Sequence, residues 1–312
     1  ILYEDGRVFG IDLEQQLTSS ILYVNSLSAP RAVFTSGHNE RPSNALKKLL
    51  SDSNFTVETK AVIPSELGTP EVIVIAAPTA DFSPEHVAAL KDALHNGSKL
   101  MVFIEPGEDR MPNLDAFLKG YGLASRRDIL FEQRAFAAGL PQYIILMYTA
   151  HPANTYFIDQ PIFVVAPSSS ALELTGDALH DTQALLTTTN DAYAKPAGTS
   201  VSTKMEKGDE SGKFTVAALS DDQVFLMGSR MVYADDLMGA SSYANRLFHV
   251  QVLGALWHED IGVSIPPKTL ESAPLPLAGN QAETIGLVLS VILPVMVLAA
   301  GAYVTLRRRK SL

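Results

Sequence analysis

The chain of 312 residues contains no cysteine, which excludes a disulfide scaffold, a cysteine zinc site, an iron–sulfur cluster and a cysteine nucleophile. Its 20 glycines and 18 prolines are too few for a collagen-like or low-complexity chain. The phosphate-binding patterns GxxxxGKS/T and GxGxxG are missing too, so we expect the chain itself to bind neither ATP nor a dinucleotide. What is present is a hydrophobic fraction of 46%, enough for a sizeable core in one or two domains.

Taken together, acidic residues outnumber basic ones in the chain outside one short segment near the carboxyl end. The formal net charge is −10, but Arg307, Arg308, Arg309 and Lys310 place +4 near the carboxyl end, so the rest of the chain carries −14. A nucleic-acid-binding surface needs a basic face, which this acidic body does not provide. We therefore expect no nucleic-acid partner.

A long uncharged run precedes the basic cluster. Residues 284–306 are 23 residues without a charge, and as a helix they would span roughly 35 Å, enough to cross a lipid bilayer. Membrane helices tolerate Pro294, and Pro294 with Gly301 would allow bending and close approach to other helices. The alternative is a buried core helix. Since basic residues stay on the cytoplasmic side, residues 307–312 predict a cytoplasmic tail and an extracytoplasmic body on a bacterial cell membrane.

The first residues show no export signal. Ile1 is followed by neither a basic nor an apolar leader segment, so we expect a signal peptide or membrane helix upstream of it. Residues 1–30 are then the lead-in of a truncated amino-terminal region. Residues 265–283, rich in proline and small polar residues, predict a linker between the membrane helix and an extracytoplasmic domain at 31–264.

Apolar strands alternate with amphipathic helices in the first part of that domain. Val72–Ala76 is continuously apolar, as in a strand buried on both faces. Ser83 and Pro84 predict the start of a helix, and Asn96 and Gly97 predict its end. Residues 31–127 therefore predict an α/β fold with an open, mostly parallel, doubly wound sheet.

The second part, residues 128–264, predicts a mixed α/β region. We expect strands at 140–148 and 160–166, a β-hairpin that turns at 220–222, and a helix from about 242 to 257. Residues 191–212 are polar and have no apolar period, which predicts an exposed loop or hairpin tip.

The candidate site follows from the predicted sheet. Ligands of doubly wound sheets bind beyond the carboxyl ends of the strands. That edge supplies the candidate ligand- or partner-binding residues, which are Thr35, Ser36, Gly37, His38, Glu40, Pro78, Thr79 and Glu105. His38, Glu40 and Glu105 could supply an acid–base pair or a hard metal site. The alternative is that these are the ordinary polar turns of a parallel sheet.

We assign no catalytic residue, metal ligand or cofactor from the sequence. Ser36 is not part of a GxSxG nucleophile motif, and residues 258–260 (HED) follow a predicted helix end, where polar residues are expected anyway. Two alternatives to a non-catalytic role stay open. One is a cell-surface hydrolase that uses Ser36, His38, Glu40 and Glu105. The other is a solute-binding receptor, in which residues from about 131 to 264 form the other wall of a cleft.

Several short segments resemble one known family, and together they run along nearly the whole chain. They are residues 17–24 (LTSSILYV), 33–40 (VFTSGHNE), 74–83 (VIAAPTADFS), 97–106 (GSKLMVFIEP), 228–230 (GSR), 253–257 (LGALW) and 265–268 (IPPK). The predicted membrane helix with Pro294 and Gly301, followed by Arg307 to Arg309, is also typical. The chain resembles the GldG-like auxiliary components of ABC-type transport systems, first associated with gliding motility.

This resemblance implies a membrane-anchored, non-catalytic auxiliary subunit. Its partners would be the lipid bilayer, an ABC permease and an ATPase subunit, with ATP hydrolysis belonging to another chain. The resemblance also implies an outer α/β domain similar in layout to flavodoxin-like and glutamine-amidotransferase-like sheets. The catalytic cysteine of those amidotransferases has no counterpart here, and the family provides no catalytic residues to carry over.

Overall fold

The computed structural model describes residues 2–4, 7–11, 30–62, 67, 71–107, 110–158, 160–175, 179–198, 202–257, 268–269 and 296. The chain divides into two compact units. One holds residues 12–267, and the other is formed by residues 1–11 together with residues 268–312.

Five parallel strands form one half of the central sheet in the larger unit. Their order is β4-β3-β5-β6-β16, and every neighbouring pair is parallel. Counted along the chain this is 2-1-3-4-5, the doubly wound order of flavodoxin. The bounds are β3 (Arg31–Ser36), β4 (Thr56–Ala61), β5 (Val72–Ala76), β6 (Lys99–Phe103) and β16 (Val224–Met227). The prediction of an α/β fold with an open parallel sheet is confirmed.

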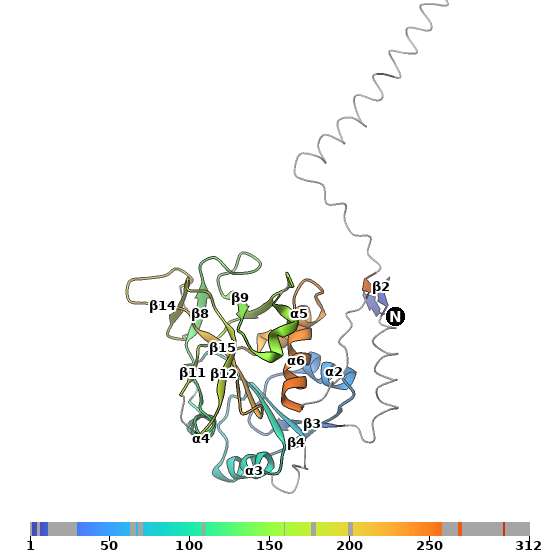
Figure 1. Ribbon diagram of the computed structural model, residues 1–312, viewed down its shortest axis with the longest axis vertical. Helices are drawn as coiled ribbons and strands as arrows, with labels where there is room; N and C mark the ends of the chain where they lie inside the picture. The colour runs from blue at the N-terminus through green and yellow to red at the C-terminus, as the bar shows by residue number, and fades with distance from the viewer. Residues whose placement is uncertain are drawn as a thin grey trace, which may run out of the picture. The chain divides into compact units, whose positions relative to one another are not determined.

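Helices cover both faces of this sheet (Figure 1). Val72 and Val74 of β5 belong to one apolar cluster, whereas Ile73 and Ile75 belong to the other, because successive strand residues point to opposite faces. The first cluster includes α2 (Asn44–Asp52) and α6 (Asn245–Trp257), and the second includes α3 (Pro84–His95) and α4 (Pro112–Lys119). An ion pair between Arg246 and Asp52 (2.8 Å) joins α6 to α2, which lie side by side in Figure 1.

The ends of α3 follow the predicted capping signals. The Ser83 hydroxyl accepts a hydrogen bond from the His86 backbone N–H at 3.2 Å, and Pro84 occupies the first helical position. After the helix, Gly97 adopts a φ of +94°, a conformation that a side chain disfavours. The loop can therefore turn directly into β6.

Antiparallel strands continue the sheet beyond β16. The order runs β16-β15-β12-β9-β10, and the β15–β16 hairpin confirms the predicted one. Its turn contains Asp221 and Asp222, both with positive φ. The remaining elements of this region are β7 (Leu123–Ser125), β9 (Tyr143–Tyr148), η1 (Pro152–Phe157), β10 (Val164–Pro167), β11 (Leu172–Leu174), β12 (Thr182–Thr187), β15 (Thr215–Ser220), η2 (Met231–Tyr233) and α5 (Asp235–Gly239).

The prediction of an exposed loop or hairpin tip at 191–212 is correct in that the segment contains a hairpin, but its two strands, which belong to a separate three-stranded sheet, were not predicted. This sheet consists of β8 (Ile129–Glu132), β13 (Ala192–Lys195) and β14 (Glu210–Gly212), in the order β14-β13-β8. Strand β13 is fully buried, since Tyr193 stacks on Phe131 and Lys195 forms an ion pair with Asp209 at 3.0 Å. Alanine and a paired lysine produce no apolar period, so the sequence pattern did not indicate the strand.

The smaller unit contains a further three-stranded antiparallel sheet. It is formed by β1 (Leu2–Glu4), β2 (Arg7–Ile11) and β17 (Lys268–Thr269). The lead-in and linker predicted at 1–30 and 265–283 thus include strands that the sequence analysis did not anticipate. No helix among the described residues is long and apolar enough to cross a membrane. Pro294, Gly301, Arg307, Arg308 and Arg309 of the predicted anchor lie outside the described residues.

Candidate functional site

In doubly wound sheets of this order, ligands bind at the position between the carboxyl ends of β3 and β5. Here backbone hydrogen bonds join the turns that follow these two strands. The backbone N–H groups of Thr79 and Ala80 both donate to the His38 carbonyl at 3.0 Å. The Arg41 N–H donates to the Ala76 carbonyl at 2.9 Å. The predicted edge residues after β3 and β5 are therefore close together, but they bond to one another.

His38 is buried at the centre of these turns. Its ring stacks on Phe82 with a centroid distance of 3.7 Å. Nδ1 lies 3.2 Å from Glu40 Oε1, and Nε2 lies 2.9 Å from His86 Nδ1. Both ring nitrogens are thus engaged, and no hydrogen bond joins Ser36 to His38 in the described part of the chain. These contacts of His38 stabilise the turns and do not form a serine nucleophile with its base.

The carboxylate of Glu40 is held in its charged form. Burial alone would raise the pKa of Glu40, but hydrogen bonds from the His38 ring and the His38 backbone N–H outweigh it and lower the pKa to about 2. A carboxyl group with so low a pKa is a poor general base near neutral pH.

Glu105 is the predicted edge residue that lies in a cavity. The segment after β6 places its carboxylate between two guanidinium groups. Arg41 Nε donates to Oε2 at 3.0 Å, and Arg230 Nε donates to Oε1. The exposed fractions of the side chains are 27% for Glu105, 50% for Arg41 and 30% for Arg230. The cluster is accessible to solvent and to a ligand.

The cavity beside this cluster has a volume of about 480 Å³, within the range of small-molecule sites. It lies between the two predicted parts of the domain, 31–127 and 128–264. The first part contributes Arg41, Glu105, Pro106 and Gly107, and the second contributes Ile129, Ser168, Ala197, Gly198, Arg230 and Met231.

The segment after β16 positions Arg230. A Cβ atom on Gly228 would lie 2.2 Å from the carbonyl oxygen of Ser170, so only glycine fits there. The Ser229 hydroxyl donates to the carbonyl of Pro167. These two contacts fix the backbone just before Arg230, whose guanidinium then meets Glu105.

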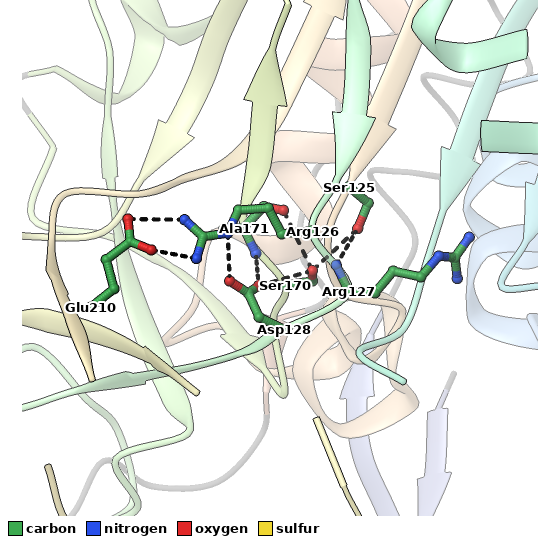
Figure 2. Close-up of polar contacts among 7 residues, drawn as sticks. All are labelled: Ser125, Arg126, Arg127, Asp128, Ser170, Ala171 and Glu210. Atoms are coloured by element: carbon green, nitrogen blue, oxygen red, sulfur yellow. Dashed lines mark hydrogen bonds and ion pairs between the residues drawn. The ribbon is translucent and has the colours of Figure 1, made fainter. Parts of the chain in front are cut away.

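A polar network, buried at Asp128 and Ser170 and exposed at Glu210, fixes the junction between the two parts of the domain. Figure 2 shows Arg126 between Glu210, which accepts at 3.0 and 2.6 Å, and Asp128, 2.9 Å from Nε. Asp128 also accepts hydrogen bonds from the Ala171 N–H at 2.8 Å and the Ser170 hydroxyl at 3.2 Å. Burial raises the pKa of Asp128 despite these bonds. Ser170 is fully buried, so this serine and aspartate hold the loop together and are closed to a substrate.

Residues of this network are close in sequence to two residues that line the cavity, Ile129 and Ser168. Asp128 directly precedes Ile129, and Ser170 lies two positions after Ser168. The Gly107 N–H also donates to the Arg127 carbonyl at 3.2 Å. The polar network therefore fixes the part of the cavity lining that Ile129 and Ser168 form.

The structure assigns the predicted residues to two places. Glu105 lines the cavity, whereas Thr35, Ser36, Gly37, His38, Glu40, Pro78 and Thr79 are not among its lining residues. Sequence analysis missed Arg41 and Arg230 as site residues. The available signal was their position, since each follows the end of a parallel strand by a few residues. In the described part of the chain, no group of three or more His, Asp or Glu side chains could hold a metal ion.

Comparison with known proteins supports the fold. No family model and no curated protein matches the sequence. Among solved structures, the mmIFT52 N-terminal domain is similar with a TM-score of 0.58 and 17% identity, covering 75% of this chain and 100% of that one. A protein from Thermoplasma acidophilum described as part of a GMP synthase matches with a TM-score of 0.41 and 8% identity, covering 74% and 96% of the two chains. PurLQS from Thermotoga maritima matches with a TM-score of 0.37 and 10% identity, covering 74% and 99%.

Proposed function

We propose that the protein is a membrane-anchored, non-catalytic auxiliary subunit of an ABC-type transport system. Its α/β domain would lie outside the cell membrane, where it binds a solute or docks on the permease. Residues 284–306 would form the anchor beside the helices of the permease, with residues 307–312 in the cytoplasm. ATP hydrolysis would belong to a partner subunit.

The division of charge along the sequence is the observation that carries this proposal. A body of −14 is followed by 23 uncharged residues and then by a +4 cluster, as expected for a domain anchored from outside. The resemblance to GldG-like auxiliary components agrees with this topology. We propose as well that the sheet has the layout of amidotransferase-like domains, which the same resemblance implies.

The geometry favours binding over hydrolysis. A cell-surface hydrolase would need the Ser36, His38, Glu40 and Glu105 edge to converge on a substrate. His38 is occupied by Glu40 and His86, and Glu105 is paired with two arginines. A stand-alone solute-binding receptor is the second candidate, because the cavity of about 480 Å³ lies between the two parts of the domain.

Co-purification tests the auxiliary role. We expect the full chain, extracted in a mild detergent and captured by an affinity tag, to retain a permease and an ATPase subunit in fixed proportions. An unrelated tagged protein with a single carboxyl-terminal membrane helix, extracted in the same way, is the control. If the chain purifies without either subunit while remaining folded, the auxiliary role is wrong. Solute binding by that purified chain would then favour the receptor.

A further inference from the structure

The cavity between the two parts of the domain contains two arginines and one carboxylate. We propose that it binds the anionic group of a small molecule, a carboxylate or a phosphate, through Arg41 and Arg230. This inference names the ligand class of the binding domain and rests on the proposed function for its biological role.

Both arginines keep hydrogen-bonding groups that a ligand can use. Arg41 and Arg230 each contact Glu105 through Nε. In the described ranges, no terminal Nη group of either arginine donates a hydrogen bond to a neighbour. A guanidinium carries five N–H donors in a planar fork that matches carboxylate and phosphate oxygens. The two side chains together therefore present unused donors at the cavity.

The charges that line the cavity also favour an anion. The described lining residues include two cations and one anion and together carry a net charge of +1. The rest of the protein is acidic, yet salt limits the reach of exposed charges to a Debye length of about 8 Å at physiological ionic strength. Groups in contact with a ligand therefore outweigh the distant acidic surface.

The rest of the cavity lining suits the uncharged part of such a ligand. Beside the two arginines, the cavity is lined by Pro106, Ile129, Ala197 and Met231, which offer apolar contacts. Such a wall fits a small molecule with one anionic group and an uncharged remainder. Two features support a binding surface: the accessible ion cluster and the apolar wall meet in one cavity of about 480 Å³.

Replacing Glu105 and replacing either arginine should change the affinity for an anion in opposite directions. The Glu105 carboxylate bridges the two guanidinium groups, neutralises one of their two charges and repels an incoming anion. Glutamine removes that negative charge and offers one acceptor oxygen in place of two, so E105Q leaves more of the guanidinium charge and donors to a ligand and is expected to tighten anion binding. Arg41→Ala and Arg230→Ala are expected to weaken it. A purely structural ion cluster predicts no such opposition.

Isothermal titration of the full chain in detergent micelles tests the site. The probes are phenyl phosphate, benzoate and uncharged benzamide, which share one ring and differ in charge. We expect saturable binding of phenyl phosphate or benzoate, at least about tenfold tighter than benzamide, because hydrogen bonds to a charged group are the stronger ones. The tighter of the two anions identifies a phosphate or a carboxylate as the natural group.

Variants connect the binding to the cavity. R41A and R230A should each raise the Kd of the tighter probe at least about tenfold, whereas R230K should lose less because it keeps the charge. Arg134→Ala removes an arginine that is 81% exposed and does not line the cavity, and it should bind as the parent does. Fluorescence of the single tryptophan, Trp257, reports whether each variant is folded.

Three results would overturn the proposal: no saturable binding of either anion, equal binding of benzamide, or unchanged binding by both R41A and R230A. Failure of the transport role is seen separately. A chain that binds an anion but co-purifies with no permease overturns the proposed function and leaves the anion site standing. A chain that co-purifies normally but binds no anion does the reverse.

Discussion

Glu40 shows at the residue scale how a charged group can serve stability instead of chemistry. Its side chain is 10% exposed, and His38 donates to it from the backbone at 2.9 Å. The pKa of Glu40 is about 2 in the folded protein, below its ordinary value of 4.5. A group with a depressed pKa contributes stability above its unfolded value and loses that contribution as the pH falls towards the folded one.

We expect Glu40→Gln to remove a pH-dependent share of stability. At pH 7 the variant should lose at most about 3 kcal/mol of unfolding free energy, and this difference should shrink between pH 5 and pH 2. Denaturant unfolding of the full chain in micelles, followed by the fluorescence of Trp257, measures it. Glu173→Gln, on the exposed position of β11, is the matched control. Parallel pH profiles of the parent and E40Q would contradict the assigned role of Glu40.

At the element scale, the turn after β16 connects the sheet to the cavity. Gly228→Ala would place a methyl group against the Ser170 carbonyl, which belongs to the backbone and cannot rotate away. We expect a loss of about 1–3 kcal/mol of unfolding free energy. Anion binding should weaken as well, because Arg230 follows two residues later. Thermal unfolding and titration with the same probes measure the two effects.

The matched control for this turn is Gly239→Ala. A Cβ atom there meets nothing within 4 Å, so both stability and binding should stay close to those of the parent. If G228A bound anions as the parent does despite its lower stability, the turn would support the fold but would not position Arg230.

The start of α3 gives a second prediction at this scale. Ser83 caps the helix through its hydroxyl, whereas Ser43 precedes α2 without any side-chain capping bond. Ser83→Ala should therefore cost about 1 kcal/mol of unfolding free energy, and Ser43→Ala clearly less. Denaturant unfolding of both variants compares the two positions directly. Equal losses would show that the capping bond adds nothing at Ser83.

Local signals explain why the first part of the domain was predictable. Val72–Ala76 is apolar throughout, and Ser83 and Pro84 mark a helix start, so both elements follow from short stretches of sequence. Strand β13 (Ala192–Lys195) depends instead on a distant partner, because Lys195 is buried through its ion pair with Asp209. No pattern within residues 192–195 contains that information.

The site was predictable only in part for the same reason. The rule for doubly wound sheets selected Glu105, which lines the cavity. It did not show that hydrogen bonds to the His38 carbonyl join the turns after β3 and β5. Nor could it pair Glu105 with Arg230, which is 125 residues further along the chain, because that contact depends on β16 joining β6.

At the scale of the whole molecule, the absence of cysteine makes the proposed topology directly measurable. A chain with no thiol gives no background with a membrane-impermeant maleimide, so each introduced cysteine reports a single position. Ser51 is exposed on α2 in the proposed outer domain, and Ser311 belongs to the basic tail. Ser290 lies within the uncharged run at 284–306.

We expect S51C to react in intact spheroplasts and S311C to react only after the membrane is permeabilised. S290C should stay unlabelled in both states, because a thiol within the bilayer does not meet the aqueous reagent. The reason is the charge division: moving the +4 tail outward would oppose the positive-inside preference, whereas the acidic body carries no such restraint. The parent chain serves as the background control. Labelling of S311C from outside, or of S51C only after permeabilisation, would reverse or abolish the proposed orientation and with it the extracytoplasmic placement of the anion site.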